Sequence, residues 1–223
     1  MMKFALVGPG QLGQQVFKAA AGERLIVGED LMAAETFGKE AELGVTTDMT
    51  QAAQCQVAAV CVPPAGCETA FQQLCPNLAP GSLVLNFSTK WVIPQELREQ
   101  FPQLTLLEAK LVGSAVGLSY GLYKVVVLGT QDAEITKCVQ EALPGMNVVA
   151  GDYTLVKDIN TLATRTALAA ALSLEKELTA QGLAPEMIKA AVGGLMPGVL
   201  ISYSNDTLGG FAREIVKQLQ EQN

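Results

Sequence analysis

The residues of this sequence that are best suited to chemistry begin close to the N-terminus, in a glycine-rich turn. A short apolar run, Phe4–Val7, is typical of a strand buried on both faces, and the pattern G-x-G-x-x-G follows it. Glycines at these spacings allow a tight turn, the approach of a pyrophosphate to the backbone, and close packing of a helix on the strand. The N-terminus of that helix offers N–H groups and a positive dipole end to phosphates. Over a glycine turn without a ligand, we therefore predict a dinucleotide-binding loop made by Gly8, Pro9, Gly10, Gln11, Leu12 and Gly13.

An acid follows the second predicted strand, Arg24–Val27, at the place where such a fold binds a ribose. Glu29 stands sixteen residues after Gly13, close to the interval of about 20 residues at which an acid accepts from the ribose 2′-OH. The same carboxylate repels a 2′-phosphate, and the next fifteen residues hold no arginine and one lysine, Lys39. We therefore predict an NAD(P) cofactor and favour NAD over NADP. The alternative is a solvated pair of acids after a turn.

A lysine and an asparagine far along the chain could act on a substrate. Lys157, Asn160, Thr161 and Thr164 are spaced to share one face of a helix, at the point where the predicted nucleotide domain ends. An ammonium held in a cleft can have a lowered pKa and can donate a proton to a carbonyl or an imine. We name Lys157 and Asn160 as catalytic candidates, with a solvated helix start as an equal alternative.

The stretch Glu108–Tyr123 is rich in glycine, with Gly113, Gly117 and Gly121 among small residues. Such a loop can present backbone N–H groups to a substrate carboxylate, or it can be a plain connection between two strands. Lys110 could pair with an anionic substrate, but we expect it to face water because isolated lysines are usually exposed.

Composition excludes several classes of function. The net charge is −7, which argues against a nucleic-acid partner. The chain has no histidine, which removes Ser-His-Asp and Cys-His mechanisms and the commonest zinc ligand, so we predict no metal site. Acid–base chemistry must then come from Lys, Asp, Glu, Tyr or Cys.

The cysteines and the apolar stretches predict where the protein works. The five cysteines form no C-x-x-C pair and are expected to be reduced, small apolar residues of a cytoplasmic protein. The first strand begins so close to Met1 that we expect no signal peptide. The longest mostly apolar stretch, Ala190–Ile201, is shorter than the ~18 residues of a membrane span and contains Pro197. We therefore expect no membrane partner.

Strands and helices alternate along the first two thirds of the chain, which predicts a mostly parallel sheet with helical crossovers. Ligands of such sheets bind beyond the carboxyl ends of the strands. The predicted strands are Phe4–Val7, Arg24–Val27, Val57–Val62, Ser82–Phe87, Leu104–Ala109, Tyr123–Leu128 and Met146–Ala150. The predicted helices between them are Gln14–Ala21, Leu31–Glu42, Ala65–Leu78, Gln95–Gln100 and Asp132–Leu143.

From Asp152 onward the pattern is helical only. One helix runs to Gln181, a second starts at Pro185 with interruptions at residues 193–194 and 197–198, and a last one is capped by Asn205 or Asp206. The sequence thus predicts an α/β fold, a Rossmann-type doubly wound, mostly parallel sheet over 1–150, followed by a small all-helical domain over 151–223. So short a helical domain cannot easily bury its own apolar residues, so we expect it to pack on the first domain and to form a homodimer.

Four motifs occur in an order that resembles the β-hydroxyacid dehydrogenases. They are G-P-G-Q-L-G at 8–13, N-F-S-T at 86–89, E-A-K-L-V-G at 108–113 and K-D-I-N at 157–160. The stretch E-K-E-L-T-A-Q-G-L at 175–183 resembles the pyrroline-5-carboxylate reductases. Both groups belong to one broad superfamily of NAD(P)-dependent oxidoreductases, in which a Rossmann domain precedes a helical, dimer-forming domain.

The resemblance implies a role for each matching position. Lys157 would be the catalytic acid–base residue with Asn160 beside it, although the family motif has an asparagine where Thr161 stands and a proline where Lys110 stands. The nicotinamide ribose would be bordered by Val62, Pro63 and Ser88, and the substrate carboxylate would lie at Gly113 and Ser114.

These observations favour an oxidoreductase that transfers a hydride between nicotinamide and a carbonyl/hydroxyl or imine/amine carbon of a small, carboxylate-bearing substrate. A non-catalytic nucleotide-binding sensor or partner protein is the first alternative, because the catalytic-helix motif and the glycine loop depart from the family. An S-adenosylmethionine-dependent transferase is the second, because Val62-Pro63-Pro64 loosely resembles a motif of those enzymes.

Overall fold

The computed structural model describes residues 2–28, 35 and 44–221, and its internal contacts divide the chain into two compact units. The first unit is Met1–Asn160 and the second is Thr161–Asn223; each is described by itself. The division lies within a continuous helix, α7 (Leu155–Ala180), and not at a loop. The change from mixed to helix-only structure, on which the predicted domains 1–150 and 151–223 rest, lies between β8 and α7.

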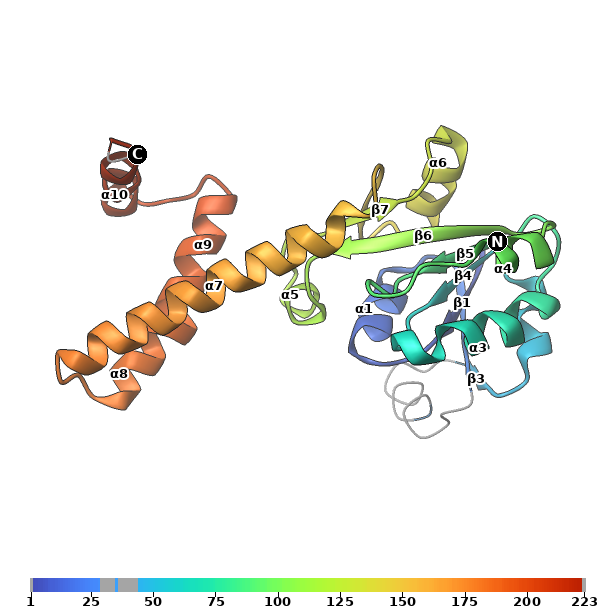
Figure 1. Ribbon diagram of the computed structural model, residues 1–223, viewed down its shortest axis with the longest axis horizontal. Helices are drawn as coiled ribbons and strands as arrows, with labels where there is room; N and C mark the ends of the chain where they lie inside the picture. The colour runs from blue at the N-terminus through green and yellow to red at the C-terminus, as the bar shows by residue number, and fades with distance from the viewer. Residues whose placement is uncertain (1, 29–34, 36–43, 222–223) are drawn as a thin grey trace. The chain divides into compact units, whose positions relative to one another are not determined.

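The first unit is built on a sheet that has eight strands in the part of the chain described (Figure 1). Their order is β3-β2-β1-β4-β5-β6-β7-β8, and every neighbouring pair is parallel except β6 and β7. The strands are β1 (Lys3–Val7), β2 (Glu23–Val27), β3 (Gly44–Thr46), β4 (Val57–Val60), β5 (Leu83–Asn86), β6 (Thr105–Val112), β7 (Val125–Leu128) and β8 (Asn147–Ala150).

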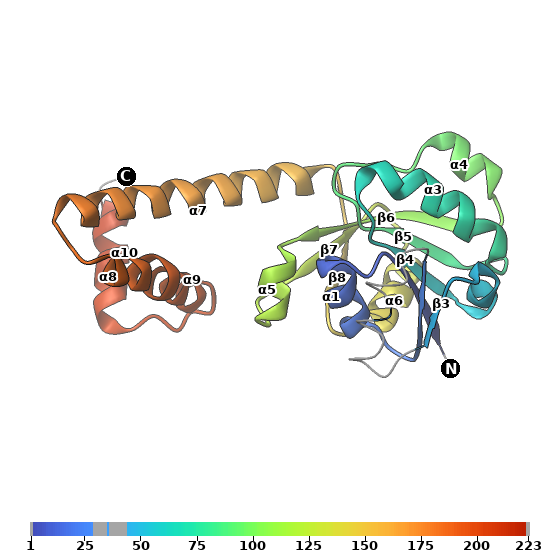
Figure 2. The same cartoon turned by 90° about the horizontal axis from the view of Figure 1, so that it is seen from below.

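Helices cover both faces of this sheet, with α3 and α4 on one face and α1 and α6 on the other (Figure 2). A short helix, α5, packs against α1. The helices are α1 (Gln11–Ala19), α3 (Pro64–Leu74), α4 (Gln95–Gln100), α5 (Ala115–Ser119) and α6 (Ala133–Ala142), with 3₁₀ turns at Met49–Gln54 and Cys75–Asn77.

The apolar runs of the central strands supply two cores, because successive side chains of a strand point to opposite faces. On β1, Phe4 packs in the cluster that holds Phe17 of α1. Its neighbour Ala5 packs in the cluster that holds Phe71 of α3. All four side chains are completely buried. A strand covered on both faces needs an unbroken apolar run, and this is why the run in the sequence predicted it correctly.

The predicted Rossmann-type fold is confirmed, and each predicted strand is present with ends shifted by one to three residues. β3 and α5 were not predicted, because three and five residues are too few to show a periodic pattern. α1 begins at Gln11 and not at Gln14, since Gln14 N donates to Gly10 O (2.9 Å) and the glycine motif itself forms the first turn. The predicted helix Leu31–Glu42 lies almost wholly outside the described residues.

The second unit consists of helices: most of α7, then α8 (Pro185–Ala190), a π-helical turn (Ala191–Leu195), α9 (Met196–Ser204) and α10 (Gly210–Glu221). The interruption predicted at 193–194 is the π-helical turn. The interruption predicted at 197–198 is wrong, because the helical run continues through these residues, which lie in the first turn of α9 directly after the π-helical turn. The predicted cap at Asn205 or Asp206 is also wrong: α10 starts at Gly210.

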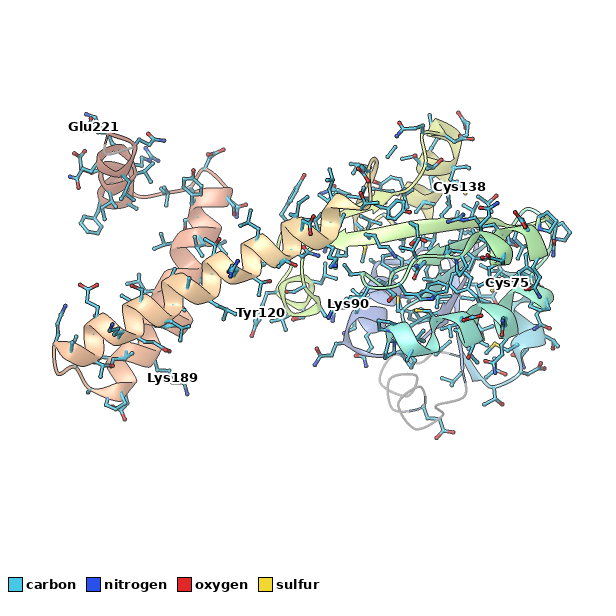
Figure 3. The ribbon with its side chains drawn as sticks, in the orientation of Figure 1. Cys75, Lys90, Tyr120, Cys138, Lys189 and Glu221 are labelled. Atoms are coloured by element: carbon cyan, nitrogen blue, oxygen red, sulfur yellow. The ribbon has the colours of Figure 1, made fainter. Side chains whose placement is uncertain are left out.

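The helices of the second unit form no closed core of their own. None of the described residues from 161 to 221 is fully buried, and Lys189 of α8 and Glu221 of α10, both labelled in Figure 3, are exposed. The helical run Pro185–Ser204 has 20 residues and a mean hydropathy of 1.3, long and apolar enough to cross a membrane by length and composition. The expectation that no segment reaches that length is therefore wrong, because the run continues through Pro197. Soluble core helices meet the same two criteria.

Candidate functional site

The turn between β1 and α1 is packed so tightly that two of its three motif glycines have no room for a side chain. Gly8 has φ +93°, and a Cβ there would lie 2.7 Å from Cys61 O and from Val62 Cγ1. A Cβ at Gly13 would lie 2.0 Å from the carbonyl oxygen of Gly8. The first turn of α1 therefore packs directly on the β1 turn, and that turn packs on the residues that follow β4.

Gly10 differs from these two glycines, because a Cβ there would meet no protein atom within 4 Å. The residue is exposed, with φ −68° and ψ −177°, a conformation that any residue adopts. Gly10 is the N-cap of α1, and no side chain caps the helix there, so the first N–H groups have no side-chain acceptor. An open, uncapped helix N-terminus with no Cβ in front of it fits a pyrophosphate that must approach the main chain.

The loops after β4 and β5 meet at a buried thiol. Cys67 of α3 has one S–H proton, which is shared between the carbonyl oxygens of Val62 (Sγ–O 3.7 Å) and Pro63 (3.5 Å), and the side chain of Ser88 also interacts with this thiol. Burial raises the pKa of this thiol, so it stays protonated and can donate. The structure thus brings together the three residues predicted to border the nicotinamide ribose.

Lys110 of β6 is one of the most buried side chains of the first unit, with 2% of its surface exposed. Its ammonium lies 2.6 Å from Glu108 Oε2 and donates to the carbonyl oxygens of Asn86 (3.3 Å), Ser88 and Trp91 (3.1 Å). Burial lowers the pKa of Lys110, and the hydrogen bond to Glu108 opposes that shift. The expectation that Lys110 faces water is therefore wrong, because one carboxylate oxygen of β6 and three carbonyl oxygens from the end of β5 and the loop after it compensate the buried charge.

The carboxylate of Glu108 accepts hydrogen bonds from both ends of the segment that follows β5. Its carboxylate takes hydrogen bonds from Asn86 Nδ2 (2.8 Å) and from the main-chain N–H of Ile93 (2.6 Å), and Arg98 Nη2 lies 3.7 Å away. Asn86 Oδ1 in turn accepts from the N–H of Ser88 (3.0 Å). These contacts form one connected network of charged and amide groups at the carboxyl end of β5.

The predicted substrate loop is tied to α7 through Asn160. Its Oδ1 accepts from the N–H of Gly113 (3.2 Å), and its Nδ2 donates to Leu111 O (2.9 Å). Gly113 has φ +142°, which disfavours any side chain. Ser114 caps α5, since its Oγ accepts from Gly117 N (3.0 Å). The amide of Asn160 therefore clamps the point at which β6 ends.

Lys157 is exposed and stands one turn before Asn160 on α7. The described contacts do not test its catalytic role, which stays a prediction. Glu29, the predicted ribose acid, lies outside the described residues. Among the described residues, no group of three or more His, Cys, Asp or Glu could hold a metal ion.

Sequence reasoning missed several residues that shape this site. Asn86 and Glu108 are polar residues inside apolar strand runs, and each is at most 1% exposed. A buried polar residue at the end of a central strand was the signal that could have drawn attention to them. Cys67 gave no such signal, because a small apolar residue on a helix is ordinary.

No protein-family model and no curated protein sequence matches this chain. Solved structures do match. A pyrroline-5-carboxylate reductase from Coxiella burnetii shares 13% identity at a TM-score of 0.73, over 99% of this chain and 90% of that chain. The 3-hydroxyisobutyrate dehydrogenase of Mycobacterium tuberculosis shares 15% identity at a TM-score of 0.65, over 87% of this chain and 70% of that chain. The Plasmodium falciparum pyrroline carboxylate reductase, solved with NADP bound, shares 12% identity at a TM-score of 0.64, over 99% of this chain and 90% of that chain.

The chain therefore has the fold of these NAD(P)-dependent oxidoreductases, as the motif order predicted. Identities of 12% to 15% show the fold alone. The site residues have to carry the functional argument.

Proposed function

We propose that this protein is an NAD(P)-dependent oxidoreductase that transfers a hydride between nicotinamide and a carbon of a small, carboxylate-bearing substrate. That carbon belongs to a carbonyl/hydroxyl or an imine/amine pair. The observation that carries the proposal is Gly10: the fold leaves open space where its side chain would be, at an uncapped helix N-terminus. The fold shared with dehydrogenases and reductases supports the same activity.

The cofactor would lie across the carboxyl ends of β1, β4 and β5. When bound, nicotinamide supplies the redox chemistry, and the chain binds and orients the reactants. In this proposal the main chain of Gly8–Gly13 holds the pyrophosphate and Glu29 accepts from the adenosine ribose. The nicotinamide ribose is bordered by Val62, Pro63 and Ser88, which the structure gathers round Cys67.

The substrate would be held beyond the end of β6. Gly113 and Ser114 would lie at its carboxylate, and the ammonium of Lys157 would donate a proton to the carbonyl oxygen or imine nitrogen. We assign Asn160 to the same site, where its amide sets the position of the Gly113 main chain. We favour NAD over NADP because the carboxylate of Glu29 would repel a 2′-phosphate.

A nucleotide-binding sensor without catalysis is the second candidate. Thr161 stands where the resembling enzymes carry an asparagine, and the amide of Asn160 is already hydrogen-bonded to the main chain. Tight NADH binding without turnover of any small hydroxy acid or imino acid would favour this candidate over the enzyme.

We also propose that the protein is a homodimer through its second unit and that it works in the cytoplasm, where its five cysteines, all free in the structure, stay reduced. The helices α9 and α10 line an apolar groove of about 630 Å³ that includes Leu200, Phe211, Ile215 and Leu219. Phe211 is 84% exposed in the single chain. Apolar side chains gathered on a face that the second unit itself leaves uncovered are typical of a subunit interface.

Calorimetric titration of the full chain with NADH, NADPH and S-adenosylmethionine tests the cofactor. We expect a dissociation constant near the micromolar range for NADH, about −8 kcal/mol in binding free energy, and weaker binding of NADPH. Binding of S-adenosylmethionine alone would assign the protein to the transferases. Absence of binding to both nicotinamide cofactors would end the proposal.

Turnover then tests the catalytic residue. With an active substrate from a panel of hydroxy acids and imino acids, Lys157→Ala should lower kcat by about 100-fold or more. Lys189→Ala, an exposed lysine of α8, is the matched control. Equal turnover by Lys157→Ala and wild type would remove Lys157 from the mechanism.

A further inference from the structure

The buried pair of Lys110 and Glu108 is not needed for the strand structure around it. β6 pairs with β5 and β7 through its main chain, and an apolar side chain at either position would be cheaper to bury than a charge. The two side chains are 2% and 1% exposed, with 2.6 Å between Nζ and Oε2. Because burying these two charges is costly, we look for the role of the pair in the groups that it contacts.

The pair holds one segment, the eight residues from Asn86 to Ile93 that leave the carboxyl end of β5. Three of the four oxygens round the Lys110 ammonium are carbonyls of this segment, those of Asn86, Ser88 and Trp91. The carboxylate of Glu108 accepts from the far end, at the Ile93 N–H.

This arrangement fixes both the path and the direction of the segment. An ammonium has three N–H donors and no acceptor; here its four oxygen neighbours share these donors, and three of the four are carbonyls of the segment that turn toward it. Two further hydrogen bonds lie within the network, since Asn86 Oδ1 accepts from Ser88 N and Asn86 Nδ2 donates to Trp91 O (2.9 Å). In the described structure no buried side-chain nitrogen or oxygen lacks a partner. The segment thus has one well-determined conformation.

Ser88 is the member of this segment that the motif resemblance assigns to the nicotinamide ribose. Its side chain interacts with the thiol of Cys67, which donates to the carbonyls of Val62 and Pro63. The Lys110 network therefore connects to the loop after β4 through one serine and one thiol, and so links the two loops that are predicted to border the nicotinamide ribose.

We infer that Lys110 is a positioning residue for the nicotinamide half of the cofactor, acting through the Asn86–Ile93 segment. The inference rests on the proposed function. Lys110 cannot itself touch the cofactor or the substrate, because its ammonium is enclosed by four protein oxygens and is 2% exposed. Its effect must pass through the main chain of Ser88.

The test compares the affinities of the full chain for NADH and for ADP-ribose. In Lys110→Met, we expect NADH binding to weaken by about tenfold or more, while ADP-ribose, which lacks nicotinamide, binds within about twofold of wild type. Lys137→Met makes the same chemical change at an exposed lysine of α6, outside this segment, and should leave both affinities unchanged. Equal changes for NADH and ADP-ribose would reduce Lys110 to a general stability role and overturn the inference.

A second readout needs no cofactor. Hydrogen exchange of the amides at 87–93 should speed up by about tenfold in Lys110→Met relative to Lys137→Met, with the rest of the sheet unchanged. Unchanged exchange in this segment would overturn the inference even if cofactor affinity fell. If wild type bound neither NADH nor NADPH, the proposed function and the cofactor role would fail, and faster exchange would still show separately that Lys110 fixes the segment.

Lys110→Met leaves the carboxylate of Glu108 buried without its cation, so that variant can fail to fold. The double variant Glu108→Gln/Lys110→Met removes both charges and keeps similar side-chain volumes. It should fold and show the same loss of affinity for NADH relative to ADP-ribose, because the three carbonyl oxygens still lack their hydrogen-bond donor. A folded double variant with the wild-type ratio of the two affinities would overturn the inference.

Discussion

The two units of this chain use apolar residues in opposite ways. In the first unit many large apolar side chains form closed cores: Phe4, Phe17, Phe71 and Phe87 are at most 1% exposed. In the second unit Phe211 is 84% exposed, and none of its described residues is buried. Both units are rich in apolar residues, so composition alone does not separate them.

The difference shows which unit can stabilise itself. Two layers of helices cover the sheet of the first unit and give it complete cores on both faces. The helices of the second unit remove too little surface from water to offset their own ordering. Its stability must then depend on what covers it, and for a subunit interface that makes it depend on protein concentration.

The largest expected effect comes from a matched pair of truncations. Phe71→Ala should lower the unfolding free energy of the first unit by about 3–5 kcal/mol, because it leaves a cavity in a closed core. Phe211→Ala should leave that unit's denaturant midpoint unchanged, because its ring lies outside any core of the chain. Urea unfolding followed by near-UV and far-UV circular dichroism measures both. A similar loss from the two variants would mean that the second unit is as well packed as the first.

The glycine turn allows a second, smaller test that separates folding from binding inside the first unit. Gly13→Ala should cost about 1–3 kcal/mol or more in stability, because its Cβ would lie 2.0 Å from Gly8 O. Gly10→Ala should change stability by less than about 0.5 kcal/mol but weaken NADH binding by about tenfold or more. Thermal unfolding and calorimetric titration check the two quantities. Wild-type NADH affinity in Gly10→Ala would show that no ligand approaches the main chain there.

A charge in the groove should break the proposed dimer and leave the first unit intact. Phe211→Glu places a carboxylate among the apolar side chains of α9 and α10 and should raise the dimer dissociation constant by about 100-fold. Gln218→Glu adds the same charge on α10 outside the groove lining and is the control. Sedimentation velocity over a range of concentrations gives both constants. A wild-type chain that stays monomeric at high concentration would contradict the interface.

The smallest expected effect is on acid stability, and it concerns the first unit only. Asp48 and Asp152 each accept from the hydroxyl and the N–H of the threonine two residues later. These hydrogen bonds hold the pKa of each carboxyl below its ordinary value of 3.8. Because the folded-state pKa is depressed, the contribution is present above the ordinary value and is lost as pH falls through the depressed one.

The double variant Asp48→Asn/Asp152→Asn should therefore flatten the fall of the melting temperature below about pH 4. Asp206→Asn in the second unit is the control. A melting curve of the double variant that still tracks wild type down to about pH 3 would show that these caps do not set the acid limit.

The sequence by itself determined the local features. The apolar run at Phe4–Val7, the glycine spacing that follows it and the alternation of strands and helices each act within a few residues of chain. They predicted the fold class and the loop that the structure places at the N-terminus of α1. Such features can be read from sequence because backbone sterics and side-chain periodicity depend on neighbours along the chain.

The tertiary structure alone decided what depends on distant partners. From sequence, Lys110 has the features of a surface lysine, but in the structure the carbonyls of a segment some twenty residues away enclose it. The hydrogen bonds of Asn160 likewise come from the end of β6 and the residue after it. Whether a charge is buried or solvated depends on the oxygens that reach it in three dimensions, and these come from strands that the sequence separates. The apolar residues of the last helices illustrate the same rule, since their pattern marks a face to be covered and does not specify its partner.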